Sequence, residues 1–262
     1  AVTACRIDLS AVPAGRSIAS LFLLPRCGME CRFCASELGF DVMAFDPACD
    51  LLRALRDRGF ANVVLGGGEP FLWPHGVRAL AEVAQGFGFL VQASTNGLVL
   101  PEGFEAVDAI DRYILPLEAA DPASHDSLRS GRRIPSGHHG LVMRRIDALV
   151  RAGREFTIST VVTRRNLAGL PALAAELDGL ARAGARLHAW HLYRFLPVGR
   201  GGRPHAPELA VGPDEYREAV ASVRGRSRAF PIYRRDDMLR TRSVEFFWYE
   251  AGSLRIGTNA WR

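Results

Sequence analysis

Lysine is absent from the 262-residue sequence, so all 33 basic side chains are arginine. This absence excludes a lysine nucleophile that forms a Schiff base and a phosphate-binding loop built around lysine. Long apolar runs are missing as well, because a run such as residues 18–24 is far too short to cross a bilayer. The first residues also lack the pattern typical of a signal peptide. We therefore expect a cytoplasmic protein without a membrane anchor.

Cysteine is scarce and unevenly distributed. Only five cysteines occur, and three of them, Cys27, Cys31 and Cys34, fall within eight residues. An odd number with this clustering is not typical of a disulfide framework and favours metal ligands. The formal net charge of +5 would suit an acidic partner. The arginines are scattered, however, and form no basic stripe, which argues against a nucleic-acid partner.

Short β-rich apolar runs alternate with longer helical patterns, which predicts repeated βα units around a parallel sheet. The fold class we expect is α/β, a partial (β/α)6 TIM-like barrel with a short C-terminal strand and hairpin extension. We expect a lead-in over residues 1–17, the barrel over 18–228 and the extension over 229–262. Strands are predicted at 18–24, 62–65, 89–93, 112–117, 156–162 and 187–195, and helices at 47–58, 74–85, 139–152, 170–183 and 213–224.

The three clustered cysteines follow the first predicted strand in the spacing C-x3-C-x2-C. In parallel β/α folds the carboxyl ends of the strands carry the ligand-binding loops. Three close thiolates suit a [4Fe-4S] cluster, since a tight loop can hold three irons and leave the fourth open. A zinc ion and unliganded buried thiols are the alternatives. Structural zinc requires four protein ligands, and no further cysteine or histidine lies at suitable spacing.

An aromatic residue precedes the last cysteine of the loop, and Gly67-Gly68-Glu69-Pro70 follows the second predicted strand. This combination resembles the radical S-adenosylmethionine (SAM) superfamily. The resemblance implies two cofactors, a [4Fe-4S] cluster and SAM, and an external one-electron donor of the flavodoxin or ferredoxin type. In that family the open iron chelates SAM, and one electron releases a 5′-deoxyadenosyl radical that abstracts hydrogen from the substrate.

The same resemblance implies a set of SAM contacts. Gly67, Gly68 and Glu69 would bind the methionyl amino group. The turn that contains Ser94 and Asn96 would lie near the ribose and the methionyl carboxylate. The remaining contacts expected are Arg129 to the carboxylate, Phe33 beside the adenine, and the backbone near Leu196 beside the adenine. Each has an ordinary alternative: an Asn-Gly turn, a core aromatic or a surface arginine.

Arginines also follow the later predicted strands. Arg165, Arg200 and Arg234 are expected to converge on the mouth of the barrel, with Asp236 available to orient hydroxyl or amino groups. Arginine forks match phosphates and carboxylates, which predicts an anionic small metabolite, such as a sugar acid or nucleotide, or a peptide as substrate. Solvated surface arginines are the competing interpretation. Glu118 replaces the Asp of the family's usual Asp-Gly pair, and we include it as a candidate substrate residue.

Cys5 and Cys49 lie outside the loop, and no cysteine follows Cys49. The SPASM and twitch branches of the superfamily carry cysteine-rich extensions, so this sequence is more similar to the minimal members with a single cluster. Two other functions stay open. One is an activase that places a glycyl radical on a partner protein, and the other is a non-catalytic iron–sulfur or zinc module.

Overall fold

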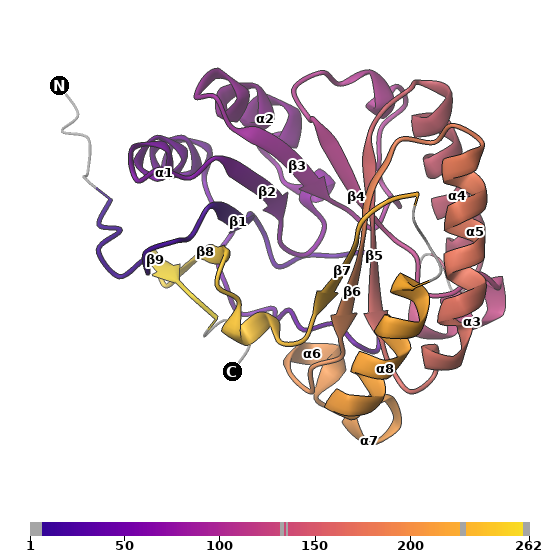
Figure 1. Cartoon of the computed structure of the whole chain (residues 1–262). Coiled ribbons are helices and arrows are strands. Elements are labelled where there is room, and N and C mark those ends of the chain that lie inside the picture. The colour runs from indigo at the N-terminus through magenta and orange to yellow at the C-terminus, as the bar shows by residue number, and fades with distance from the viewer. Residues whose placement is uncertain (1–6, 132–133, 135, 226–228, 259–262) are drawn as a thin grey trace, which may run out of the picture.

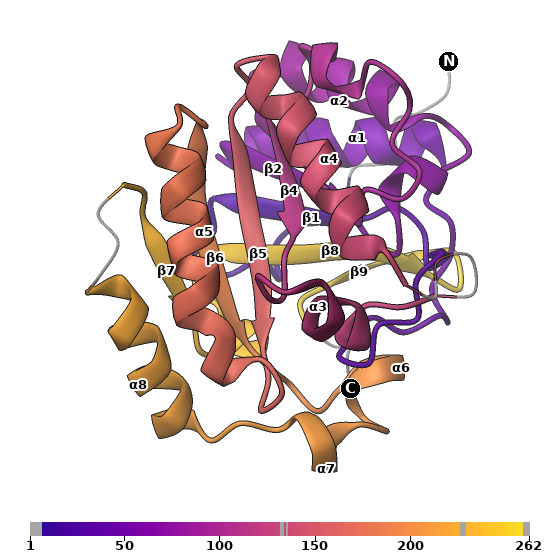
Figure 2. The same ribbon diagram turned by 90° about the vertical axis from the view of Figure 1, so that its right-hand side faces the viewer.

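The computed structural model describes residues 7–131, 134, 136–225 and 229–258. One nine-stranded sheet organises these residues in the order β7-β6-β5-β4-β3-β2-β1-β8-β9. All neighbouring strands from β7 to β8 pair in parallel, and β9 pairs with β8 in antiparallel fashion. The sheet is open and strongly twisted, so that β8 lies crosswise to β5 in Figure 2. This is the partial barrel expected from the alternating pattern.

The strands are short and the principal helices run for three to four turns (Figure 1). The strands are β1 Ile18–Phe22, β2 Asn62–Gly66, β3 Leu90–Ser94, β4 Arg112–Pro116, β5 Phe156–Val162, β6 Leu187–Arg194, β7 Ile232–Arg235, β8 Val244–Glu250 and β9 Ser253–Ile256. The helices are α1 Phe45–Asp57, α2 Val77–Gly86, α3 Pro122–Leu128, α4 His138–Arg151, α5 Leu170–Arg182, α6 Gly199–Gly202, α7 Ala206–Leu209 and α8 Pro213–Arg224.

The six predicted barrel strands and five predicted helices are all present, with boundaries that differ by a few residues. Three short helices, α3, α6 and α7, were not predicted. Helix α3 begins after Asp121, whose side chain accepts a hydrogen bond from the Ser124 amide at 2.8 Å. Pro122 then occupies the first turn of the helix. An N-terminal Asp followed by Pro is a recognisable helix start, so this element could have been found in the sequence.

The last three strands join the sheet at opposite edges. Strand β7 pairs with β6, whereas β8 pairs with β1 and carries β9 as a hairpin. The segment that connects β7 to β8 contains a short 3-10 turn, Met238–Arg240, and joins the two sides of the open barrel. Residues 229–258 thereby extend the sheet at both ends.

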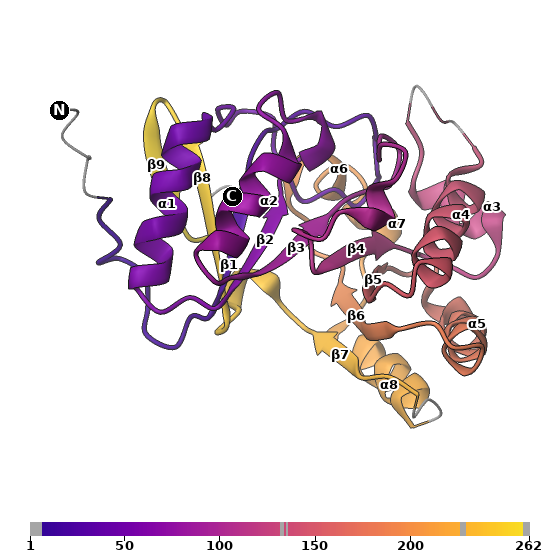
Figure 3. The ribbon, with the colours of Figure 1, turned by 90° about the horizontal axis from the view of Figure 1, so that it is seen from above.

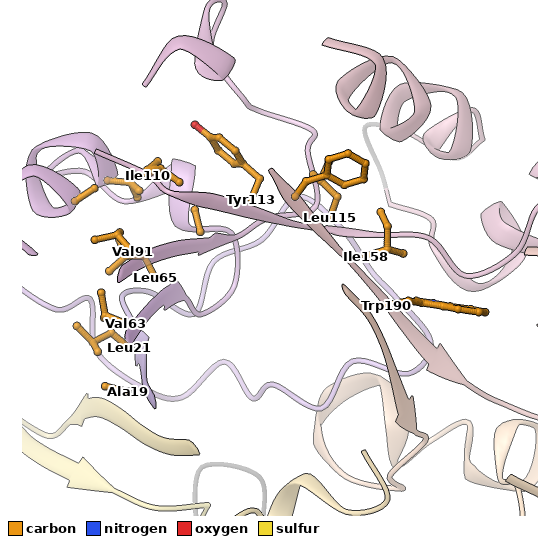
Figure 4. Close-up of a cluster of buried hydrophobic side chains, with 14 of the residues drawn as sticks. Ala19, Leu21, Val63, Leu65, Val91, Ile110, Tyr113, Leu115, Ile158 and Trp190 are labelled. Atoms are coloured by element: carbon orange, nitrogen blue, oxygen red, sulfur yellow. The ribbon is translucent and has the colours of Figure 1, made fainter. Parts of the chain in front are cut away.

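Side chains alternate across the sheet, as the period of two in a strand requires. Leu65, Val91 and Ile158 lie in the main hydrophobic core with the helices, and Figure 4 shows part of this cluster. Their strand neighbours Gln92 and Ser159 are only half-buried and lie on the other face. Figure 3 shows α4, α5 and α8 outside the curve of strands β4 to β7. The helices therefore cover the convex face and leave the concave face for polar groups.

No helix among the described residues is both long enough and apolar enough to cross a membrane.

Candidate cluster and cofactor site

The cysteine loop, residues 27–34, leaves the carboxyl end of β1 and is held by backbone hydrogen bonds. The Glu30 amide donates to the Ser130 carbonyl at 2.7 Å, and the Arg32 amide donates to the Leu128 carbonyl at 3.2 Å. Cys31 is 8% exposed, while Cys27 and Cys34 are half-buried. The segment after α3 therefore fixes the loop from one side.

Glycines allow other segments to pack directly on this loop. A Cβ atom at Gly201 would lie 2.2 Å from the Cys31 carbonyl oxygen, and one at Gly68 would lie 2.2 Å from the Arg26 carbonyl oxygen. Gly67 adopts φ +121°, and a Cβ atom there would lie 2.7 Å from the Leu24 carbonyl oxygen. The Gly68 amide donates to the Leu24 carbonyl at 2.7 Å. The structure thus gives Gly67 and Gly68 a packing role against the start of the cysteine loop.

Each cysteine side chain has its own polar neighbour. Asn96 Nδ2 donates to Cys27 Sγ at 3.4 Å, and Arg129 donates to Cys31 Sγ at 3.6 Å. The Arg200 guanidinium hydrogen-bonds the Cys34 side chain, and it also donates to the Met29 carbonyl at 3.3 Å. Donors aimed at sulfur stabilise thiolates, the form in which cysteine binds iron.

Burial opposes ionisation of the free thiols. Desolvation raises the pKa of Cys31 to about 12, with the nearby Arg129 charge acting in the lowering direction, and burial also raises the pKa of Cys27. A bound metal deprotonates such thiols outright. Among the described side chains, no three His, Cys, Asp or Glu groups converge on one ion position. A cubane needs no such point, because each cysteine binds a different iron. Three thiols in one loop with three donors around them fit a [4Fe-4S] cluster.

Glu118, a predicted substrate residue, is engaged by protein groups. Its side chain is fully buried and forms an ion pair with Arg129 at 2.6 Å. Its other oxygen accepts the Val161 amide hydrogen at 2.7 Å. Glu118 therefore anchors Arg129, and its role at the substrate stays a prediction. The side chain of Arg129 itself is 13% exposed.

Glu69 is likewise engaged by protein groups. One carboxylate oxygen accepts from the Thr95 hydroxyl at 2.7 Å and from the Phe71 amide at 3.2 Å. The other accepts from the Asn96 amide at 2.8 Å. With 1% exposure, this carboxylate braces the turn that carries Asn96, and its contact with the methionyl amino group stays a prediction.

The other predicted SAM contacts differ in burial and in their partners. Phe33 is 7% exposed, and the Arg129 guanidinium carbon lies 4.9 Å from the centre of its ring. Ser94 is exposed at the carboxyl end of β3. The Leu196 carbonyl accepts the Val198 amide hydrogen at 2.9 Å, in the segment that leads to α6. The structure thus brings Phe33, Asn96 and Arg129 together around the thiols.

The predicted arginines have different partners. Arg165 forms an ion pair with Glu208 at 2.8 Å, a carboxylate that Arg32 shares. Arg200 lies on α6 and donates a hydrogen bond to the Met29 carbonyl of the cysteine loop at 3.3 Å. Arg234, on β7, pairs with Asp236 at 2.7 Å. The last pair lines a cavity.

That cavity, about 460 Å³, lies along the connection between β7 and β8. It is lined by Arg234, Arg235, Asp236, Asp237, Met238, Arg240, Thr241, Arg242 and Ser243. Arg234 and Arg240 each lie beside an aspartate. No carboxylate of the described residues pairs with Arg235 or Arg242, so the lining has an excess of positive charge.

Sequence reasoning did not select two residues near the site, His138 and Asn166. His138 is fully buried at the start of α4 and hydrogen-bonds both His125 and the Asn96 carbonyl. Asn166 donates to the Glu118 carbonyl at 2.8 Å. The sequence offered one signal, a His-His pair at the start of a predicted helix.

Comparison with known proteins agrees with this geometry. Residues 21–177 match the radical SAM superfamily. The AdoMet-dependent heme synthase of Nitratidesulfovibrio vulgaris is 29% identical over 201 residues, which cover 74% of this chain and 52% of that protein. An S-adenosylmethionine-dependent nucleotide dehydratase from a Thermoplasmatales archaeon is 25% identical over 151 residues, 56% of this chain and 53% of that protein. The chain thus spans about half the length of these curated relatives.

A solved structure with the same fold is SuiB of Streptococcus suis bound to S-adenosylmethionine. It superimposes with a TM-score of 0.63 and 16% identity, covering 84% of this chain and 50% of SuiB. Together, the open parallel barrel and the cysteine loop define the class of enzymes that use an iron–sulfur cluster and SAM. The chain belongs to the radical SAM superfamily, whose cofactors are a [4Fe-4S] cluster and SAM.

Proposed function

We propose that Cys27, Cys31 and Cys34 hold one [4Fe-4S] cluster and that the protein uses it to cleave SAM reductively. The observation that carries this proposal is the convergence of three thiols in one loop, each with a separate side-chain donor. When bound, the cluster supplies one electron for breaking a carbon–sulfur bond of SAM.

The protein's own residues prepare that site. Arg129 offers a cation beside Cys31 for the SAM carboxylate, and Glu118 fixes its orientation. Phe33 packs against the same guanidinium and would lie beside the adenine. Ser94, exposed at the end of β3, can hydrogen-bond the ribose. Glu69 holds the Thr95–Asn96 turn, and so acts on SAM through Asn96.

Release of 5′-deoxyadenosine tests this function. We expect the anaerobically reconstituted protein to produce it from SAM and dithionite, and the Cys31→Ala variant to lose that production. Cys49→Ala is the matched control and should behave as the wild type, because Cys49 lies on α1 outside the loop. Wild-type protein that binds iron without producing 5′-deoxyadenosine would instead support the non-catalytic module. A glycyl radical on a partner protein would support the activase.

The substrate we propose is a small anionic metabolite, with a sugar acid or nucleotide preferred to a peptide. The cavity beside β7 supports this substrate class, because Arg235 and Arg242 contribute positive charge to its lining. Neither arginine pairs with a carboxylate of the described residues, so both can bind an anion. The dehydratase relative is named for nucleotides. Arg234 and Asp236 shape the same cavity as an ion pair. The electron donor we propose is a flavodoxin or ferredoxin.

Binding of pyrophosphate and ATP tests the cavity. We expect Arg242→Gln and Arg235→Gln each to weaken binding by about tenfold, because a charge-assisted hydrogen bond contributes roughly 1.5–3 kcal/mol. SAM cleavage without substrate should be unaffected. Arg78→Gln is the control, since Arg78 forms only an exposed pair with Glu82 on α2. Unchanged binding in both cavity variants would contradict an anion site here.

A further inference from the structure

Two buried histidines form a continuous hydrogen-bonded relay beside the cysteine loop. The Glu118 amide donates to His125 Nδ1 at 3.0 Å. His125 Nε2 lies 2.8 Å from His138 Nδ1, and His138 Nε2 lies 2.8 Å from the Asn96 carbonyl oxygen. Both imidazoles are fully buried, and their ring centres lie 5.1 Å apart with the two planes inclined by 24°. The relay thus joins β4 to the turn after β3 through α3 and α4.

The partners at the two ends fix the protonation of both rings. His125 Nδ1 accepts an amide hydrogen, so the proton of a neutral ring must be on Nε2. That proton is donated to His138 Nδ1, and His138 therefore carries its own proton on Nε2. The Asn96 carbonyl accepts it. Every ring nitrogen of the pair is consequently satisfied, which removes the penalty for burying two neutral imidazoles.

The relay ends at the two residues that hold donors against the cysteines. Asn96 receives the relay on its carbonyl and donates through Nδ2 to Cys27 at 3.4 Å. The Glu118 amide begins the relay, and the Glu118 carboxylate accepts a hydrogen bond from Arg129 at 2.6 Å. Arg129 in turn donates to Cys31 Sγ at 3.6 Å. A displacement of either histidine would move both donors relative to the sulfurs.

We propose that His125 and His138 are positioning residues that set the reduction potential of the cluster by holding Asn96 and Arg129 against the Cys27 and Cys31 sulfurs. Reduction adds one electron to the cluster, and N–H donors to the sulfurs stabilise that added charge. Second-shell partners that orient such donors have large effects on metal sites. The inference rests on the proposed three-cysteine cluster.

Redox titration of the reconstituted protein, without SAM, tests the relay. His138→Phe keeps a ring of similar area and removes both nitrogens. We expect it to retain its iron and to become harder to reduce, so that the ratio of reduced to oxidised cluster at a fixed potential falls by about tenfold. His138→Gln keeps a donor near the Nε2 position and should restore much of the wild-type value.

His139→Phe is the matched control. His139 follows His138 on α4 and is nearly as buried, but its Nε2 has no partner among the described residues. A general packing effect would shift the potential of both variants, whereas the relay predicts a shift only at His138. An unchanged potential in His138→Phe, or an equal shift in His139→Phe, would overturn the inference.

A second variant covers the case in which His138→Phe does not fold. His125→Asn keeps an acceptor for the Glu118 amide and lacks the nitrogen that reaches His138, so it should also be harder to reduce. A wild-type potential in this variant counts against the relay. Wild-type protein that fails to take up about four irons would refute the proposed cluster instead, and the two failures are therefore distinguishable.

Discussion

At the scale of residues, the role of a side chain depends on contacts with residues that are distant in the sequence. The cysteine spacing and Arg129 could be selected from the sequence, because their motif is local or their chemistry is unusual. Glu69 and Glu118 look like ligand residues in the sequence. Their burial depends on hydrogen bonds to Asn96 and Val161, which lie 27 and 43 residues away. The sequence alone does not show such distant partners. The other predicted non-ligand cysteine, Cys5, lies outside the described residues.

His191 gives a residue-scale prediction on pH. It lies on the concave side of β6, where Nδ1 is 3.3 Å from the Tyr193 hydroxyl and the Tyr233 ring packs against it. Burial, followed by the charges of Arg235, His188 and Arg112, lowers the pKa of His191 to about 3. The unfolded chain binds this proton near pH 6.5. Below that pH the unfolded state takes up more protons, so the folded state loses stability as the pH falls.

We expect His191→Asn to reduce this loss. Between pH 7 and pH 5 the free energy of unfolding of the wild type should fall by about 2 kcal/mol more than that of the variant. Urea denaturation of the cluster-free protein at the two pH values measures the difference. Equal pH dependence in both proteins would show that His191 is not held neutral by the fold.

At the scale of elements, the strands and long helices follow from local patterns, and the packing between segments does not. The alternation of β and α stretches was sufficient to place the barrel. The short helices α6 and α7 have only four residues each, too few for a periodic pattern. Helix α6 nevertheless matters, because its glycines allow it to lie against the cysteine loop.

Gly201→Ala tests that contact. The new Cβ would meet the Cys31 carbonyl at 2.2 Å and the Cys34 amide nitrogen at 2.7 Å, so the loop or α6 must shift. Overpacking of this kind costs about 1–3 kcal/mol, and we expect iron incorporation to fall. Gly179→Ala on α5 is the control, since nothing lies within 4 Å of its added Cβ. It should retain iron and gain about 0.5–1 kcal/mol in stability. Full iron content in Gly201→Ala would contradict the packing role.

At the scale of the whole molecule, the C-terminal strands extend both edges of one sheet. Their existence was predicted, but their pairing partners were not, because β7 and β8 could each have joined either edge without a change in local pattern. The parallel pairing of β8 with β1 brings the connection between β7 and β8 alongside the barrel opening. This placement creates the arginine-lined cavity.

The central claim is that three cysteines hold one cluster with an iron open to SAM. The most direct measurement is electron paramagnetic resonance of the reduced, reconstituted protein before and after SAM is added, with iron counted in the same sample. We predict about four irons per chain and a signal that changes when SAM binds. About eight irons per chain, or a signal indifferent to SAM, would contradict the claim.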